Sequence, residues 1–304
     1  CEIASSVPLH QSTRGVVPEV AARAQIEAMW PILELALSNA NCRWSDIDLI
    51  AVTEGPGLIG SLLVGLTTAN AVAQLSGIPI VGVPHIWGHM YANLLDNDLK
   101  PQFPSLVLTV SGGHNDLYLW EDHGKFTRLG YTLDDAAGEA FDKCGRLMGL
   151  DYPAGISVSK LSQEGDPKAF HFPRVMQKQD SYLFSFSGLK TAFLYQLQKM
   201  TKAEIQLKQK DLCASLQEAI IESLWIKVKK AIQTFSVKEV YLSGGVSANP
   251  RLREFFQFKT QAMGLNLYYP ANIKYCTDNA AMIAAAAYYC DFPLQKIVKL
   301  NMGY

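Results

Sequence analysis

Hydrophobic and polar positions follow two periods along this chain, and segments of the two kinds alternate from one end to the other. Apolar residues recur about every 3.6 residues in long segments, which predicts helices, whereas short apolar runs bounded by turn residues predict strands. This alternation is typical of an α/β fold. The predicted helices span 17–39 (kinked at Pro31), 61–75, 85–95, 136–148, 189–200, 212–235, 250–263 and 278–289, and the predicted strands span 48–53, 78–83, 105–110, 116–120, 126–131, 238–242 and 266–269.

Length and composition narrow the class of protein. The chain has 304 residues, of which 49% are hydrophobic and 18% charged, and this excludes a disordered, collagen-like or coiled-coil protein. The length suits two lobes, each with a sheet and covering helices, better than a single sheet. The formal net charge is −1, so any contact with nucleic acid has to use a local basic patch or a helper protein.

Cysteine usage and the apolar segments predict a cytoplasmic protein without a membrane span. No stretch reaches the roughly 18 apolar residues that a span requires, because polar residues interrupt the richest segment, 57–83. The chain lacks the basic-then-apolar start of a secretory leader and opens on cysteine, so we expect that a natural start precedes it. The cysteines form no CxxC pair and are expected to be reduced and mostly buried: Cys1, Cys42, Cys144, Cys213, Cys276 and Cys290.

The first candidate site is the sequence HIWGH at 85–89. Histidines four positions apart lie about 40° apart around a helix, so His85 and His89 can reach one metal ion, with Asp278 as a candidate third ligand. A helix cap or an ordinary surface or core histidine would also explain the pair, and Asp278 would also suit the N-cap of the last helix. Ile86 stands where metalloproteases of the HExxH kind have their glutamate base, so a protease mechanism is disfavoured.

Two glycine turns are candidate phosphate sites. SGG at 111–113 and SGGVSAN at 243–249 each follow a predicted strand. Glycine lets backbone amides approach an anion closely, and the helix that begins after the second turn has an N-terminus that attracts phosphate. The alternatives are ordinary turns and, for Asn249, a plain N-cap in front of Pro250.

An acidic stripe is the third candidate. Asp135, Glu139 and Asp142 share one helical face, and three acids in a row predict a metal or a hydroxyl-rich ligand such as a sugar. Pairing of an exposed face with Lys143 or Arg146 fits the pattern equally well.

The remaining candidates are lysines and arginines. Ser187 and Lys190 match the SxxK motif of penicillin-binding enzymes, but the companion SDN and KTG motifs are absent. Ser187 is therefore expected to cap a helix, and Lys190 to be a phosphate contact or a surface charge. The best local basic clusters, with RNA as a minor alternative to plain solvation, are formed by Lys227, Lys229, Lys230, Arg251, Arg253 and Lys259.

Eight segments, taken together and in this order, resemble the TsaD family of tRNA adenosine threonylcarbamoyltransferases, once described as glycoproteases. The resemblance runs from about Gly15 to the C-terminus. The segments are GVVPEVAARAQ (15–25), TEGPGLIGSLLVGLTTA (53–69), HIWGH (85–89), VSGGHN (110–115), TLDDAAGEAFDK (132–143), FSFSGLKTA (184–192), LSGGVSANPRLR (242–253) and CTDNAAMIA (276–284).

The resemblance implies an α/β fold of the two-lobed actin, Hsp70 and sugar-kinase (ASKHA) type around a central nucleotide cleft. We expect an N-terminal lobe at 1–104, with 290–304 packing back on it, and a C-terminal lobe at 105–289. The implied activity is transfer of the threonylcarbamoyl group of threonylcarbamoyl-AMP to N6 of the adenosine 3′ of the anticodon in ANN-reading tRNAs. The implied location is the cytoplasm.

The resemblance also implies roles for single residues. The family's metal ligands fall on His85, His89 and Asp278, with iron or zinc as the ion. Asp142 is expected to take ribose hydroxyls, and no residue stands out as a general base. The full set expected to contact the adenine nucleotide is Thr109, Val110, Ser111, Gly112, Gly113, Asp142, Gly155, Ser159, Gly244, Gly245 and Asn249.

Partners implied by the resemblance are tRNA, a TsaB-like dimer partner and a TsaE-like ATPase, with no membrane. The chain departs from the family pattern at three places. It begins after the family's N-terminal hairpin with its ETSCD-like string, YPGGP appears as YPAGI at 152–156 with Ser159 in place of a frequent aspartate, and Asn115 replaces a threonine. Two other functions stay open: a metal-dependent hydrolase, which Ile86 disfavours, and a nucleotide-binding scaffold, which the late start favours and the intact ligand set disfavours.

Overall fold

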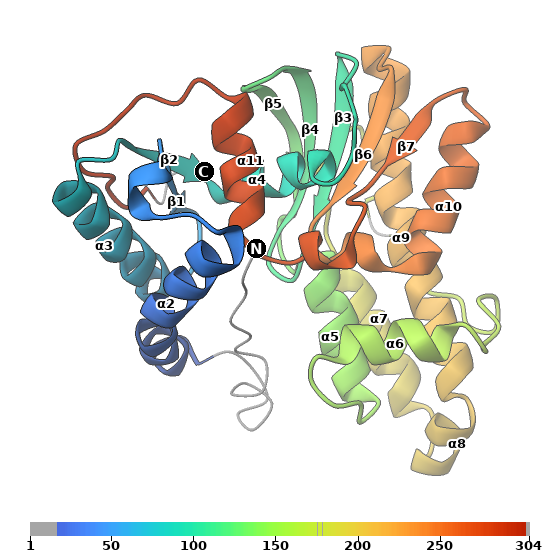
Figure 1. Ribbon diagram of the computed structural model, residues 1–304. Coiled ribbons are helices and arrows are strands. Elements are labelled where there is room, and N and C mark those ends of the chain that lie inside the picture. Colours follow the sequence, from blue (N-terminus) through green and yellow to red (C-terminus); the bar gives the residue numbers. More distant parts are fainter. Residues whose placement is uncertain (1–16, 175, 178, 302–304) are drawn as a thin grey trace. The chain divides into compact units, whose positions relative to one another are not determined.

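The computed structural model describes residues 17–174, 176–177 and 179–301 and divides into two compact units (Figure 1). Unit 1 comprises Cys1–Asn97 and Thr277–Tyr304, and unit 2 comprises Asp98–Cys276. These boundaries differ from the expected lobes, because residues 98–104 belong to unit 2 and the last helix belongs to unit 1. The helix is part of unit 1 because it packs against the helix that carries the two histidines.

Unit 1 is built on a pair of parallel strands, β1 (Ile50–Gly55) and β2 (Ile80–Pro84), connected by helix α3 (Ile59–Ser76). Strands β1 and β2 pair from Ile50↔Ile80 to Gly55↔Pro84, and the helix between them packs on β1. Its small core includes Val52, Leu66 and Ile80. The elements of unit 1 are α2 (Pro18–Ala40), η1 (Trp44–Asp46), β1 (Ile50–Gly55), α3 (Ile59–Ser76), β2 (Ile80–Pro84), α4 (His85–Tyr91), η2 (Ala92–Leu94) and α11 (Ala280–Tyr289).

The C-terminal segment is part of this unit. Asn70 Nδ2 donates to the Val298 carbonyl at 2.9 Å, and its Oδ1 accepts from the Val298 N–H at 2.9 Å, so one side chain on α3 binds both backbone polar groups of Val298. Gln295 forms a bridge to Ile80 at the edge of β2. The tail therefore extends the small sheet and buries Val298 in the core.

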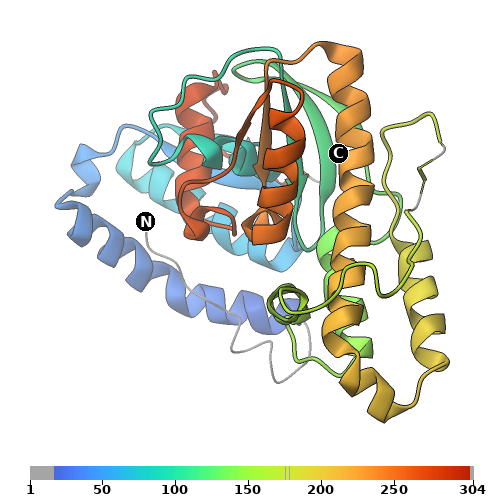
Figure 2. The same ribbon diagram turned by 90° about the vertical axis from the view of Figure 1, so that its right-hand side faces the viewer.

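Unit 2 holds a five-stranded sheet in the order β5-β4-β3-β6-β7. Strands β3, β6 and β7 are parallel, and β4 and β5 are antiparallel additions. The long helix α9 packs along one face, where most of the core lies (Figure 2). The elements of unit 2 are β3 (Ser105–Val110), β4 (Asn115–Asp122), β5 (Lys125–Tyr131), α5 (Ala137–Leu147), α6 (Ala154–Ser162), α7 (Ser187–Gln198), α8 (Lys202–Leu207), α9 (Gln209–Phe235), β6 (Glu239–Ser243), η3 (Gly245–Ala248), α10 (Pro250–Gln261), β7 (Asn266–Tyr268) and η4 (Ile273–Tyr275).

All predicted helices and strands are present within a few residues of their expected bounds. Helices α6 and α8 were not predicted, because the sequence suggested a loop-rich middle. The expectation for the cysteines is confirmed for the described residues: Cys144, Cys213, Cys276 and Cys290 are buried, and the described chain contains no disulfide. The expectation for membrane segments needs correction, since α3 is long and apolar enough to pass as a span by length and composition. Its packing on β1 and its bonds to the tail show that it also serves as a structural helix of unit 1.

Candidate metal centre and nucleotide-binding turns

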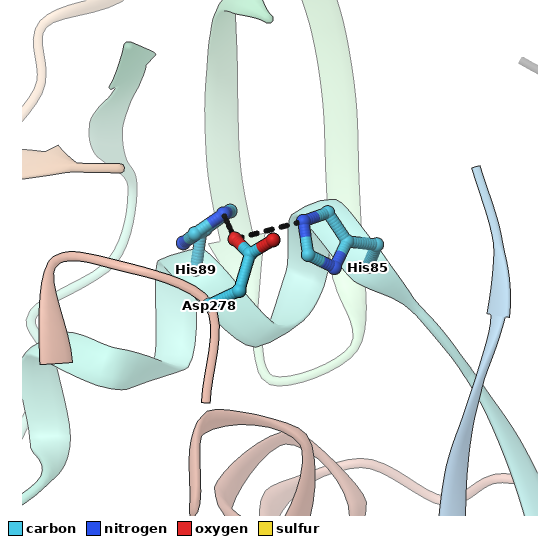
Figure 3. Close-up of side chains that lie close together, drawn as sticks. All are labelled: His85, His89 and Asp278. Carbon is cyan, nitrogen blue, oxygen red and sulfur yellow. Dashed lines mark ion pairs between the residues drawn. The ribbon is translucent and has the colours of Figure 1, made fainter. Parts of the chain in front are cut away.

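Three predicted metal ligands meet within unit 1 (Figure 3). His85 Nε2 lies 3.4 Å and His89 Nε2 3.2 Å from Asp278 Oδ1, and one ligand atom from each residue lies within 4.8 Å of the other two. The His89 side chain is 1% exposed, whereas that of Asp278 is 78% exposed. A buried imidazole thus faces a carboxylate that solvent and substrate can reach.

Local sequence explains why the histidines point to the same place. Buried strand β2 ends at Pro84, and α4 begins at once, so the spacing of four puts both rings on one side of a short helix. Helix α11 then approaches closely: a Cβ on Gly88 would lie 2.7 Å from Ile283 Cδ1 and 3.0 Å from Met282 Cγ. A glycine between the two histidines therefore allows the close packing that brings Asp278 to them.

The loop before α11 is fixed by Asn279. Its Oδ1 accepts from the Met282 amide at 2.9 Å, which makes Asn279 the N-cap of the helix, and its Nδ2 donates to the Thr277 carbonyl at 2.8 Å. The alternative that Asp278 caps this helix is therefore wrong. Capping by its neighbour leaves the Asp278 carboxylate turned toward the histidines.

The electrostatics of the three residues agree with this arrangement. Burial lowers the pKa of His89, and the nearby Asp278 carboxylate offsets this only partly. Desolvation raises the pKa of Asp278, but the favourable contacts of its carboxylate with His85 and His89 outweigh it and hold that pKa well below its usual range. At neutral pH the site therefore presents a carboxylate and a neutral buried imidazole, the forms that bind metal ions.

These residues fit a metal ion. His89 Nδ1 is buried and has no hydrogen-bond partner within the described residues, and its Nε2 makes no well-aligned hydrogen bond despite facing Asp278. Ligand atoms bound at about 2.0–2.2 Å to one tetrahedral ion lie about 3.3–3.6 Å apart, close to the observed nitrogen-to-oxygen separations. Two imidazoles and one carboxylate suit zinc and Fe(II) among biological ions. The three residues thus have the geometry and the donor set of a metal site.

The two glycine turns are neighbours in unit 2. Parallel pairing of β3 with β6 aligns Thr109 with Ser243, and their hydroxyl oxygens are 2.8 Å apart. Gly244 has a φ of +80°, and a Cβ there would lie 2.5 Å from the Val110 carbonyl oxygen. Glycine is required at this position by its conformation and by the close approach of the two turns.

The first turn is supported from behind by helix α5. The Gly138 amide donates to the Ser111 carbonyl at 3.2 Å, and a Cβ on Gly138 would lie 2.8 Å from Gly112 Cα. By contrast, nothing lies within 4 Å of a Cβ built on Gly112 or Gly113, and neither has a left-handed backbone. Packing of the described residues therefore does not explain these two glycines, whereas close approach of a ligand would.

Asp142 connects α5 to α6. Its Oδ1 accepts from the Gly155 amide at 2.7 Å. Burial raises the pKa of Asp142, and the amides of Gly155 and Ala154 lower it by less. Ser159 lies one turn further along α6 and is half-buried. The structure joins Asp142 to Gly155, with Ser159 one turn along the same helix, and the contact of these residues with a ribose stays a prediction.

Asn249 is engaged inside the protein. Its Oδ1 accepts from the Leu252 amide at 3.0 Å, and its Nδ2 donates to Gln217 Oε1 at 2.7 Å. The plain N-cap alternative is thus confirmed for this residue. Gly245 begins η3, with open space at its Cβ position, so the second turn offers its backbone rather than the Asn249 amide.

The acidic stripe is also satisfied internally. Asp135 forms ion pairs with Lys143 and with Lys190, the latter at 2.6 Å, so pairing with lysine explains this residue and no ligand is needed. Lys190 is correspondingly a partner of Asp135, which corrects its expected role as a phosphate contact or surface charge. Sequence reasoning missed this connection because 55 residues separate the two partners.

The neighbouring Asp134 caps α7. It accepts from the hydroxyls of Ser185 and Ser187 at 2.5 and 2.7 Å and from the amides of Phe186 and Ser187 at 2.7 and 3.2 Å. Ser187 was expected to cap the helix itself, but it is the first helical residue and Phe186 occupies the N-cap. No sequence motif indicates this role of Asp134.

The basic clusters do not form one surface. Lys227 is buried, Lys230 pairs with Asp180 at 2.5 Å, and Lys229 is exposed. Arg251 is held by Glu218 and Glu254, and Arg253 donates to the Ser247 carbonyl at 2.6 Å. Most of these charges are therefore structural.

Comparison with known proteins adds to this geometry. The profile of the family "TsaD: tRNA N6-adenosine threonylcarbamoyltransferase" matches residues 1–285. The chain is 45% identical over 287 residues to the protein of that name from Geotalea uraniireducens, covering 94% of this chain and 83% of the relative. The namesakes from Bacillus cereus and Kosmotoga olearia are each 46% identical over 93% and 94% of this chain and 82% and 84% of their own length.

Solved structures of low sequence identity show the fold alone. HypF from T. kodakarensis superposes with a TM-score of 0.62 at 14% identity, covering 85% of this chain and 43% of HypF. A phosphate- and nucleotide-bound full-length HypF gives a TM-score of 0.55 at 13% identity, covering 79% and 46%. They confirm the expected two-lobed α/β, ASKHA-like class. With a family profile over nearly its whole length and relatives near half identity, the chain belongs to the TsaD family of tRNA N6-adenosine threonylcarbamoyltransferases.

Proposed function

We propose that this chain transfers the threonylcarbamoyl group of threonylcarbamoyl-AMP to N6 of the adenosine 3′ of the anticodon in ANN-reading tRNAs. Family membership supports the reaction class. The observation that carries the proposal is the meeting of His85, His89 and Asp278, three residues up to 193 positions apart, at ligand distances from one another.

The triad would hold one iron or zinc ion. When bound, such an ion acts as a Lewis acid that offsets negative charge on a substrate oxygen. The chain's own contribution is to fix the ligands: the buried face of α4 orients His89, and Asn279 keeps the loop of Asp278 in place. The exposed carboxylate of Asp278 leaves the open side from which a substrate oxygen can approach.

Unit 2 would bind the adenylate. The backbone of the first turn, with its open Gly112 and Gly113, takes the phosphate or carbamoyl end, and Thr109, Val110 and Ser111 hold that turn on β3. The second turn, with Gly244 and Gly245, takes the nucleoside end, and Asn249 supports it as the N-cap of α10. Asp142, Gly155 and Ser159 form the proposed ribose contact. Because the adenosine amine is a weak nucleophile, positioning supplies much of the rate.

The exposed apolar surface of unit 1 and the near-neutral net charge support the proposal that the chain works with protein partners. Ile26 and Trp30 on α2 are 62% and 50% exposed, and Ile59 and Leu63 on α3 are 55% and 48% exposed. Apolar side chains of this size on two packed helices suit a dimer interface, and we propose a TsaB-like protein as the partner there. A TsaE-like ATPase, tRNA as the acceptor substrate, and a cytoplasmic location complete the proposal.

A metal-dependent hydrolase is the second candidate, and the structure disfavours its protease form. Ile86 occupies the position of the glutamate base, and its side chain is 6% exposed in the core of unit 1. It can neither accept a proton from water nor reach the ion.

Nucleoside mass spectrometry of tRNA tests the proposal. Cells depleted of this protein should lose threonylcarbamoyladenosine, wild type should restore it, and His89→Ala should fail to do so. His171→Ala, a change of an exposed histidine, is the matched control and should restore it. Unchanged threonylcarbamoyladenosine after depletion would refute the function, and full rescue by His89→Ala would refute the role of the triad.

A further inference from the structure

Lys227 is a buried lysine outside every site described so far. It lies on α9 and is 2% exposed. Its Nζ donates to three backbone carbonyls of one segment, those of Met176 at 2.9 Å, Gln179 at 3.3 Å and Ser181 at 3.0 Å. An ammonium group has three N–H donors, so all of them are used.

The positive charge of Lys227 stabilises the three carbonyl groups that converge on it. Converging carbonyl dipoles repel one another unless a positive donor stands between them, and burial strengthens both effects. Burial, together with the charge of Lys230, lowers the pKa of Lys227, but Lys230 itself is engaged with exposed Asp180. The ammonium group of Lys227 is thus an internal cation that joins the carbonyls of Met176, Gln179 and Ser181.

This segment is attached along α9 at further points. Arg174 Nε donates to Glu222 at 2.6 Å, and the Tyr182 hydroxyl donates to Thr234 Oγ1 at 3.0 Å. The Tyr182 carbonyl then lies against Gly130 of β5, where a side chain of any size would collide with it. Lys227 stands in the middle of this series of contacts.

The segment continues directly into the support of the first glycine turn. Phe184 pairs with Tyr131 and Leu133 through backbone hydrogen bonds. The next residues, Ser185 to Ser187, bind Asp134 as described above. Asp134 lies three residues before helix α5, whose Gly138 amide donates to the Ser111 carbonyl. An unbroken chain of contacts therefore leads from the Lys227 ammonium to the turn.

We propose that Lys227 is a positioning residue for the adenylate site, an internal cation that orders residues 179–187 and through them the Ser111–Gly113 turn. This inference rests on the proposed function for its link to substrate, whereas the ordering of the segment does not. It assigns a task to a residue that touches no reacting atom.

Lys227→Ala removes the ammonium group and leaves a space that matches n-propylammonium. We expect faster hydrogen exchange in a peptide covering residues 179–190, and a KM for threonylcarbamoyl-AMP raised about fivefold with kcat changed less, the effect of losing the net value of one or two hydrogen bonds. Added n-propylammonium should reverse both changes, whereas tetramethylammonium at equal ionic strength, which has no N–H, should not. Lys229→Ala, two residues along and exposed, is the matched control and should behave as wild type.

Unchanged exchange in residues 179–190, or equal rescue by the two ammonium ions, would overturn the proposal. If Lys227→Ala does not fold, Lys227→Met keeps the volume of the side chain without the charge, and it should show the same faster exchange and raised KM. Absence of transferase activity in the wild type would refute the proposed function alone, because the exchange and its rescue are measured without substrate.

Discussion

Two clusters of charged side chains, one in each unit, use aspartate in opposite ways. The triad of unit 1 leaves binding capacity open: His89 Nε2 is buried and makes no hydrogen bond within the described chain, and Asp278 faces solvent. In unit 2, Asp134 accepts four hydrogen bonds and Asp135 pairs with two lysines. The difference shows that polar atoms without a hydrogen-bond partner, rather than the presence of acids or histidines, indicate a ligand site.

The largest effect expected from this comparison is that of His89→Ala. In the proposed metal centre the buried imidazole is a ligand, so its removal should reduce bound metal from near one ion per chain to background and lower activity more than about 100-fold. Metal content by mass spectrometry of the purified protein measures this. Asp135→Asn, which breaks ion pairs in the other cluster, should leave the metal content unchanged. Equal loss in both variants would remove the distinction between the clusters.

Gly88→Ala should weaken metal binding without touching a ligand. The added Cβ would meet Ile283 and Met282 of α11, so α4 must move away from the helix that follows Asp278. We expect about tenfold weaker metal affinity in competition with a chelator, the typical effect of disturbing the support of a ligand. Gly65→Ala on α3, where the nearest atom is 4.0 Å away, is the control and should bind metal like wild type. An unchanged affinity for Gly88→Ala would show that the close helix packing is not needed.

Asn249→Ala tests a predicted ligand residue whose amide is already satisfied. Loss of the N-cap of α10 and of the bond to Gln217 should lower the free energy of unfolding by about 1–2 kcal/mol. Urea denaturation measures this, and Asn249→Asp, which keeps a capping oxygen, should cost less. If Asn249→Ala left stability unchanged but abolished nucleotide binding, the residue would belong with the triad rather than with the structural cluster.

The smallest expected effect is a pH dependence from Asp134. Partial burial raises its pKa, but hydrogen bonds from Ser185, Phe186 and Ser187 outweigh this and hold the pKa below its ordinary value. Its contribution to stability is therefore complete above the unfolded carboxyl pKa of about 4 and is lost as the pH falls through the lower folded value. Asp134→Asn should lower the free energy of unfolding at pH 7 by up to about 1 kcal/mol, a figure discounted for the exposure of the side chain. The variant should also lose less stability than wild type as the pH falls below about 4. Asp98→Asn, a change of an exposed acid that forms no ion pair within the described residues, should leave the acid dependence of stability as it is.

Much of the fold could be predicted from periodicity, because strands β3 and β6 and helices α9 and α10 bury regular apolar positions. The histidine pair was also predictable, since both ligands lie within one turn of one helix. Their meeting with Asp278 was suggested by residue type, but it depends on the packing of α4 on α11, which no local pattern encodes. The same packing explains why the last helix joins unit 1 and not the expected C-terminal lobe.

What the sequence could not show are the partners that satisfy polar groups over long separations. Asn279 replaces Asp278 as the helix cap, Lys190 reaches Asp135, and Gln217 takes the Asn249 amide. Each is one hydrogen bond among several that the residue type allows, and only the folded chain selects it. Lys227 was likewise grouped with surface lysines, because nothing in its neighbourhood distinguishes a buried position on α9 from an exposed one.

X-ray absorption spectroscopy of the metal-loaded protein tests most directly whether these three side chains share an ion. We predict a first shell of nitrogen and oxygen at about 2.0–2.2 Å with the outer-shell scattering of two imidazoles, and loss of one imidazole in His89→Ala. A shell of sulfur at about 2.3 Å, or a spectrum that His89→Ala leaves unchanged, would contradict the account.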